Sequence, residues 1–281
     1  MTIVYFDTSA FSNLWQSPGF SEIELRRVRR RMCSQLFARR PVMLIGPKII
    51  TEMAAFEGRP LFRKELEYLR SLPTALYARS QFERMKAEVA GFSTGVAANV
   101  FLSPEEASAI LDGASRYPHL WQDERDQLAR NKSVFTQSEI IARRAILANA
   151  GEQAAVAGRV KAWFADPNAV VTDWARTIMR KFRLELGLPS KEEAWPAPSS
   201  LPTVWAYAAY MVARIFLVNR DGRKIDENDF ADWSHYTAAA HADQLVTDDG
   251  RFNAIVQCCP APKPQAVSFK QWASGILAGA G

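Results

Sequence analysis

Short apolar segments that end in a polar turn constrain the fold of this chain more than any other feature. Residues 3–6 and 42–45 carry β-branched, aromatic and other apolar side chains at successive positions, a pattern typical of strands buried on both faces. Helical patterns follow them, over residues 21–40 and from residue 49 onward. Because strand and helix alternate, we expect an α/β layer with a parallel sheet. A further strand is expected at residues 245–246.

The middle of the chain has a different, mainly helical pattern. Residues 103–106 form a capping box with proline at the first helical position, which predicts a helix start. Two longer helices are expected at residues 137–164 and 173–186, and the proline-rich stretch 194–202 is typical of a linker or crossing. The pattern therefore predicts two parts: an α/β core of residues 1–90 and 203–281, and a helical insertion or cap of residues 91–202.

Composition indicates an ordinary globular protein. The 281 residues are 48% hydrophobic and carry a net charge of +5, which favours an anionic partner such as nucleic acid without identifying it. Cys33, Cys258 and Cys259 lack the spacing of a zinc site or a disulfide framework. The N-terminus lacks a signal-peptide pattern, and no apolar stretch is long enough to cross a bilayer. We therefore expect a cytoplasmic protein with no membrane partner.

Acidic residues stand near the ends of the apolar segments, far apart in the sequence. They are Asp7, Glu52, Asp232, Asp248 and Asp249. Ligands of open parallel sheets bind beyond the carboxyl ends of the strands, so the fold is expected to gather these acids at one edge. Clustered carboxylates repel each other, and a hard divalent cation such as Mg²⁺ relieves the repulsion because it prefers oxygen ligands. The pattern predicts a metal site.

In this order along the chain, four segments resemble those of PIN-domain nucleases. They are residues 5–9 (Tyr-Phe-Asp-Thr-Ser), residues 50–52 (Ile-Thr-Glu), the helix that starts near Asp232, and residues 245–252 (Leu-Val-Thr-Asp-Asp-Gly-Arg-Phe). The resemblance implies a three-layer α/β/α fold with a small parallel sheet, and an acidic Mg²⁺ or Mn²⁺ site that hydrolyses RNA phosphodiester bonds. It covers about residues 1–80 and 203–275 and leaves the central helical block unexplained.

The resemblance also implies a role for each matching residue. Metal binding and catalysis would fall to Asp7, Glu52, Asp232 and Asp249. Asp229 is an alternate for Asp232 because the helix register is open, and Asp248 is an alternate for Asp249 in the same way. Hydroxyl groups close to the acids would support them by hydrogen bonds, and these belong to Thr8, Ser9 and Thr247.

Positive side chains near these segments are candidates for holding the phosphates of a nucleic acid. Proximity in sequence selects Arg26, Arg30, Lys48 and Arg251. The arginine run of residues 26–31 is equally compatible with a solvated helix face. His235 lies three residues after Asp232 and shares its helix face, so it is either a substrate contact or a buried or capping histidine.

Two other classes of protein compete with the nuclease interpretation. A phosphatase of the haloacid dehalogenase type also begins with a strand that ends in aspartate, but it needs a second aspartate where this chain has Ser9. A PIN-like module that binds nucleic acid or protein without cutting stays open. We expect a metal-dependent endoribonuclease, either the toxin of a toxin–antitoxin pair or a processing enzyme. RNA is the expected partner, by resemblance only, and an antitoxin, another protein partner or a homo-oligomer stays open.

Overall fold

A parallel sheet lies at the centre of the computed structural model, which describes residues 2–37, 43–54, 61–72, 75–116, 137, 149–188, 195–221 and 228–279. The sheet has five strands in the order β3-β2-β1-β4-β5, and every neighbouring pair is parallel. The strands are β1 (Val4–Phe6), β2 (Met43–Ile45), β3 (Leu76–Tyr77), β4 (Gln244–Val246) and β5 (Gln265–Val267). The expected α/β architecture with a small parallel sheet is confirmed.

The three innermost strands are the ones that the sequence pattern predicted. Every residue of β1 and β2 is buried, as expected for strands covered on both faces. Tyr5 in β1 pairs with Leu44 on one side and Leu245 on the other. The edge strands β3 and β5 were not predicted, because one has only two residues and the other begins with an exposed glutamine.

Each of the five strands is followed by a helix. These helices are α1 (Thr8–Ser12), α3 (Pro47–Ala54), α5 (Gln81–Thr94), α12 (Gly250–Cys258) and α13 (Phe269–Ala278). Because the strands are parallel and each helix begins within a few residues of a strand end, all five helices start at the carboxyl edge of the sheet. We call this edge the rim; it is where open parallel sheets bind ligands.

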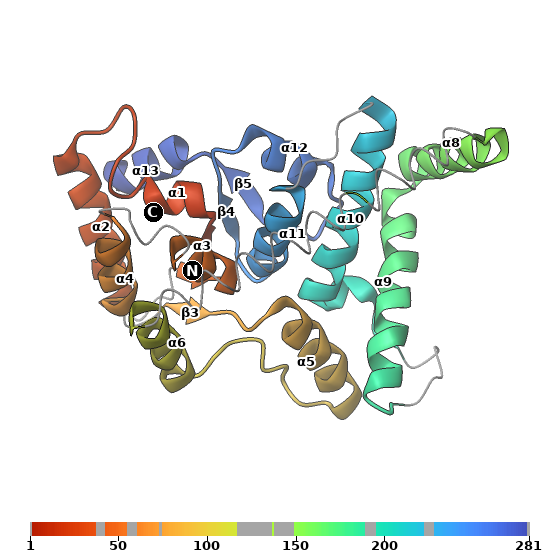
Figure 1. Ribbon diagram of the computed structural model, residues 1–281, viewed down its shortest axis with the longest axis horizontal. Coiled ribbons are helices and arrows are strands. Elements are labelled where there is room, and N and C mark those ends of the chain that lie inside the picture. The colour runs from red at the N-terminus through yellow and green to blue at the C-terminus, as the bar shows by residue number, and fades with distance from the viewer. Residues whose placement is uncertain are drawn as a thin grey trace.

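Further helices cover the sheet and extend the molecule beyond it. They are α2 (Glu22–Phe37), α4 (Phe62–Arg70), α6 (Pro104–Arg116), α8 (Ala150–Ala165), α9 (Pro167–Glu185), η2 (Pro198–Ser200), α10 (Pro202–Asp221) and α11 (Asn228–Ala239). Helix α11 packs against β1, β2 and β4, while α8 and α9 lie at the far end of the molecule in Figure 1. Helices thus flank the sheet, which is consistent with a three-layer arrangement.

The helical block differs in detail from the sequence prediction. Helix α9 begins at Pro167 rather than at residue 173, because Asp166 caps it by accepting a hydrogen bond from the backbone N–H of Ala169 at 3.0 Å. Its end near Gly187, which has a φ of 64°, agrees with the prediction. Residues 138–148 of the expected helix 137–164 lie outside the described residues, and α8 covers its final part from residue 150 onward.

A single hydrophobic core joins the sheet to the helical block. It runs from Val4 and Leu245 in the sheet, through Tyr210 in α10, to Val171 and Phe182 in α9. The apolar side chains of α10 therefore connect both parts, which fits its almost continuous burial. Among the helices in the described ranges, none is long and apolar enough to cross a membrane.

Candidate functional site

Asp7 stands at the point where β1 turns into α1, at the centre of the rim. Its backbone N–H donates to the carbonyl of Val246 at 3.1 Å, which ties the turn to β4. The Oδ1 atom of Asp7 caps α1 by accepting from the N–H of Ala10 at 2.7 Å, and it also accepts from the hydroxyl of Ser9 at 2.8 Å. The side chain is buried. Both bonds use Oδ1, so Oδ2 is the oxygen that can meet a ligand.

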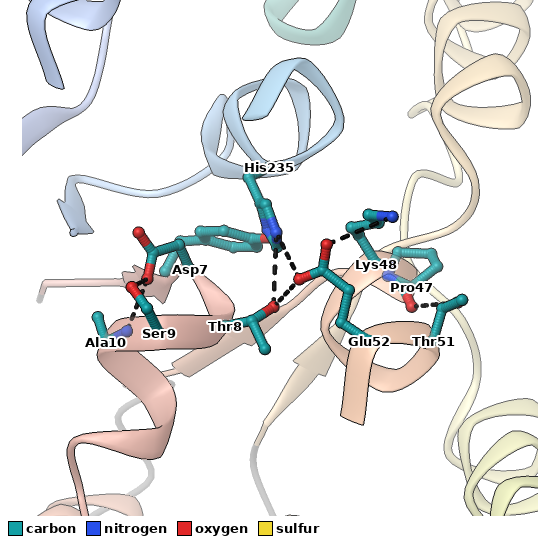
Figure 2. A network of polar contacts seen from close by, with 10 residues as sticks. Asp7, Thr8, Ser9, Ala10, Pro47, Lys48, Thr51, Glu52 and His235 are labelled. Atoms are coloured by element: carbon teal, nitrogen blue, oxygen red, sulfur yellow. Dashed lines mark hydrogen bonds and ion pairs between the residues drawn. The ribbon is translucent and has the colours of Figure 1, made fainter. Parts of the chain in front are cut away.

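Glu52 is held by side chains from three helices. Figure 2 shows Lys48 on one side of the carboxylate, and Thr8 and His235 on the other. The Nζ atom of Lys48 is 3.3 Å from Oε1, and the Nε2 atom of His235 is 3.2 Å from Oε2. The hydroxyl of Thr8 donates to the same Oε2. The elements α1, α3 and α11 therefore meet at this one carboxylate.

His235 is the buried centre of this cluster, and a tyrosine fixes its orientation. The Tyr5 hydroxyl and the Nδ1 atom of His235 share a hydrogen bond of 2.7 Å, and both residues are buried. Gly46 leaves room for that hydroxyl, since a Cβ atom at position 46 would lie 2.8 Å from it. With Nδ1 engaged by Tyr5, Nε2 points at Glu52.

The role of Tyr5 was not predicted from the sequence, although two signals for it exist. A buried tyrosine hydroxyl needs a hydrogen-bond partner, and Tyr5 is the polar member of an otherwise apolar strand. Tyr5 and Asp7 also share a strand face, because side chains alternate along a strand. For His235, the expectation of a buried histidine is confirmed.

The electrostatics of the pair follow from burial and from the charges around it. Burial works to raise the pKa of Glu52, but His235, Lys48 and the Thr8 hydroxyl outweigh it and lower the pKa to about 2. Burial works to lower the pKa of His235, but Glu52, then Asp7 and Asp232, outweigh it and raise the pKa. The carboxylates around His235 therefore favour its protonated form, and His235 and Lys48 favour the ionised form of Glu52.

Asp232 belongs to this electrostatic cluster through α11. It lies in the same helix as His235, three residues earlier, is partly buried, and helps to raise the pKa of that histidine. Its alternate, Asp229, lies in the first turn of α11, and its side chain is outside the described part of the structure. The structure thus brings Asp7, Glu52 and Asp232 to one region of the rim.

The acids after β4 have different surroundings. Asp249 is exposed and caps α12, since its Oδ1 accepts from the N–H groups of Arg251 at 2.7 Å and Phe252 at 2.9 Å. Its own N–H donates to the Thr247 hydroxyl at 3.1 Å. Asp248 accepts from the side-chain amide of Asn13 at 2.8 Å and, in a separate contact, from the N–H of Phe269 at 2.9 Å.

The donor chemistry at the rim fits a hard cation. Asp7 and Asp249 each use Oδ1 for a helix cap, and their Oδ2 atoms are oxygen donors of the kind that Mg²⁺ and Mn²⁺ take. In the portion of the chain that the structure covers, no three His, Cys, Asp or Glu side chains converge as a ready set of metal ligands. A site of this kind suits an ion that keeps much of its water, as Mg²⁺ does when it binds one or two carboxylates.

The basic candidates divide into structural and exposed side chains. Arg29 donates to the carbonyl of Leu14, and Arg31 donates to the carbonyls of Ile276 and Leu277, so these two arginines join α2 to its neighbours.

The four predicted phosphate contacts have different surroundings. Arg26 is exposed, with its Nη2 atom 3.8 Å from Oε1 of Glu22, and Arg30 is exposed on α2. Lys48 pairs with Glu52, and Arg251 is partly buried in the first turn of α12.

Comparison of the chain with protein-family models, with curated proteins and with solved structures found no match in any of the three.

Proposed function

We propose that this protein is a metal-dependent nuclease that cleaves RNA at the rim, with a PIN-like α/β core. The observation that carries the proposal is the arrangement of three acids around His235 beyond β1 and β2: Glu52 bonds its Nε2 atom, and Asp7 and Asp232 help to raise its pKa. The chain supplies these groups from three distant segments, as the resemblance to PIN-domain nucleases leads one to expect. The five-stranded parallel sheet supports the same proposal, because its carboxyl edge is the binding edge of such sheets.

In this proposal each side chain has a physical task. A bound Mg²⁺ or Mn²⁺ ion would supply a nucleophilic water and neutralise charge on the phosphoryl oxygens. Asp7 and Glu52 would hold the ion, with Asp232 and Asp249 completing the site directly or through water. Thr8 orients the Glu52 carboxylate by its hydrogen bond, and His235 does so from the other side. Lys48 places a positive charge at the edge of the site, where a phosphate would approach.

The test is cleavage of labelled single-stranded RNA and DNA by the purified protein in Mn²⁺, in Mg²⁺ and in EDTA. Asp7→Asn keeps an oxygen that can cap α1 and removes the charge, so it separates chemistry from folding. Asp173→Asn is the matched control, because Asp173 is exposed on α9. We expect cleavage of RNA that requires metal, persists in Asp173→Asn and is lost in Asp7→Asn. Metal-independent cleavage, or full activity of Asp7→Asn, would refute the assignment.

A binding module without catalysis is the second candidate, and one observation favours it. Lys48, Thr8 and His235 already surround Glu52, as they would in a site whose carboxylate serves the fold. RNA binding without cleavage in any metal would select this candidate. A toxin and a processing enzyme would share the same chemistry, so growth arrest on expression of the wild-type protein, absent for Asp7→Asn, would favour the toxin and a protein antitoxin as partner.

A further inference from the structure

A hollow of about 340 Å³ opens between α2 and α4, away from the acid cluster. Figure 1 shows these two helices together at the end of the molecule opposite α8. Three of the side chains that line the hollow are arginines, and among the described residues that line it none is acidic. The lining consists of Arg26, Arg29, Arg30, Cys33, Ser34 and Tyr68. The hollow therefore concentrates positive charge in a defined shape.

The helical repeat brings the three arginines to one side of α2. Arg26 and Arg30 are four positions apart, with Arg29 three positions after Arg26, and residues at these spacings are neighbours on a helix surface. Both Arg26 and Arg30 are exposed. Glu22 compensates part of the charge, since its Oε1 atom lies 2.9 Å from Arg29 and 3.8 Å from Arg26. One carboxylate thus stands against three guanidinium groups, and a bound anion would relieve their mutual repulsion.

Arg29 is the fixed member of the three arginines. Its Nη1 atom donates to the carbonyl of Leu14, its Nη2 atom donates to Glu22 at 2.9 Å, and these bonds use two of its five N–H donors. Its guanidinium also lies 5.7 Å from the ring centroid of Trp15. Across the hollow, the Tyr68 ring packs 5.3 Å from Trp15, and the Tyr68 hydroxyl donates to the carbonyl of Arg29 at 3.5 Å. A base held in this way loses little freedom when a ligand binds.

Trp15 also relates the hollow to the candidate site. It lies three residues after the last residue of α1, whereas Asp7 caps the first turn of that helix. Helix α1 has five residues and is therefore about 7.5 Å long. The hollow thus borders the C-terminal end of α1, and Asp7 lies at its N-terminal end. A strand bound at the acids would have to extend past α1 to reach the hollow.

We propose that this arginine hollow holds a backbone phosphate of the nucleic-acid strand that binds at the rim. The inference rests on the proposed function and adds a contact outside the acids. Charge complementarity argues for this occupant, because phosphate is the anion that repeats along a strand and a guanidinium fork matches its oxygens. Contacts to phosphate carry no sequence information, so the hollow should strengthen binding of any base sequence and lose effect as salt rises.

The experiment measures binding of a long, labelled single-stranded RNA by fluorescence anisotropy at several salt concentrations, with the full chain in EDTA. The double variant Arg26→Gln with Arg30→Gln is expected to bind about tenfold more weakly at about 0.1 M salt. Its slope of log K against log salt should be shallower by about 1.4, because each phosphate contact on a single strand contributes about 0.7. The matched control is Arg159→Gln with Arg176→Gln, which removes the same charge from exposed positions on α8 and α9 and should keep the wild-type slope.

A third protein separates charge from packing. Arg26→Lys with Arg30→Lys keeps both positive charges and should therefore keep the wild-type slope. A slope as shallow as that of the glutamine variant would show that charge is not the cause and would overturn the inference. Equal losses in the glutamine variant and in the control on α8 and α9 would overturn it as well, because any two positive charges would then have the same effect.

Cleavage assays in Mn²⁺ on the same proteins separate this inference from the proposed function. If the wild-type protein cleaves RNA and the glutamine variant binds it as the control does, the hollow is refuted while the nuclease proposal stands. If the glutamine variant alone loses binding and slope but no protein cleaves, the hollow stands and the nuclease proposal fails. If the wild-type protein neither binds nor cleaves RNA or DNA, both fail. Loss of binding to a polyglutamate peptide, with RNA binding unchanged, would identify an acidic protein segment as the occupant and refute the inference.

Discussion

The end of β1 and the end of β4 both place an aspartate at the start of a helix, yet the surroundings of the two acids differ. Asp7 is buried and helps to raise the pKa of His235, which bonds Glu52. Asp249 is exposed, and its described bonds run to its own turn and to the first N–H groups of α12. The local geometry is alike, because both cap a helix through Oδ1.

The two acids differ in the elements that surround them and not in how they cap a helix. Any aspartate at such a turn can accept helix N–H groups. At β1 the neighbouring elements α3 and α11 add a carboxylate and an imidazole, and burial strengthens their interaction. At β4 the neighbouring acid, Asp248, instead accepts hydrogen bonds from the Asn13 side chain and from the backbone N–H of Phe269 at the start of α13. Mutations at the two strand ends can therefore test the roles of the two groups of acids separately.

The largest expected difference is in catalysis by Asp7→Asn and Asp248→Asn. Both changes remove one negative charge at the rim. We expect Asp7→Asn to lose at least about 100-fold in metal-dependent cleavage, because loss of a proposed ligand should cost more than the roughly 10–100-fold that is typical for residues that only support a ligand, and Asp248→Asn to remain within about threefold of wild type. Initial rates at saturating Mn²⁺ measure this. Equal losses in the two variants would remove the distinction between the two ends.

Tyr5→Phe should weaken the cluster at the end of β1 without replacing a charged residue. It leaves Nδ1 of the buried His235 without its partner, which costs about 1–3 kcal/mol in the free energy of unfolding. It should also weaken Mn²⁺ binding by about 10–100-fold, because supporting hydrogen bonds orient metal ligands. Urea denaturation and calorimetric titration with Mn²⁺ measure the two effects.

The control for this change is Tyr77→Phe. The Tyr77 hydroxyl is also buried and donates to the carbonyl of Leu69 at 3.1 Å, but it lies outside the acid cluster. We expect a comparable loss in the free energy of unfolding and unchanged affinity for Mn²⁺. A fall in Mn²⁺ affinity as large as that of Tyr5→Phe would mean that general destabilisation, rather than the bond to His235, causes the effect.

The pH dependence of stability should report the Glu52–His235 pair. The folded pKa of Glu52, about 2, lies below its ordinary value of 4.5, so its contribution is present above pH 4.5 and is lost as pH falls toward 2. The folded pKa of His235 is raised above 6.5, so its contribution is present below pH 6.5 and is lost as pH rises through the folded pKa. The stability difference between wild type and Glu52→Gln should peak between these limits.

Urea denaturation of both proteins at pH 3, 5.5 and 8.5 tests this expectation. The difference in the free energy of unfolding should be greatest at the middle pH and smaller at both ends. Glu83→Gln is a useful comparison, because the pKa of Glu83 is lowered mainly by hydrogen bonds with Ser80 and not by a histidine. Its difference from wild type should not decline at pH 8.5. A constant difference for Glu52→Gln across all three pH values would show that the pair is not charged as inferred.

The smallest expected effect concerns the cap at β4. Asp249→Ala removes the acceptor for Arg251 and Phe252 and should lower the free energy of unfolding by about 1 kcal/mol, the typical cost of losing an N-cap. Asp249→Asn keeps an acceptor oxygen and should cost much less. Denaturation curves of the two variants measure the difference. If Asp249→Asn loses catalysis while keeping its stability, Asp249 serves the site as well as the helix.

Sequence reasoning located the inner strands and their acids because both are local features. A run such as residues 3–6 carries a β-branched or aromatic side chain at every position, and Asp7 follows it directly. The edge strands β3 and β5 escaped prediction, since two or three residues with partial exposure give too weak a pattern. The hydrogen bond between Tyr5 and His235 joins residues 230 positions apart. The sequence pattern indicates on which face of its strand or helix each side chain lies, but it does not show that the two side chains are in contact.

Gly46, a residue without a side chain, determines where the Tyr5 hydroxyl can lie. The Tyr5 hydroxyl occupies the space where a side chain at position 46 would begin, and Ala238 closes it from α11 at 3.0 Å. We expect a methyl group at position 46 to displace the Tyr5 hydroxyl from Nδ1 of His235. The imidazole would then no longer be oriented towards Glu52. The orientation of His235 towards Glu52 therefore depends on glycine at position 46, and natural variation to a larger residue there would disturb it without altering any polar side chain.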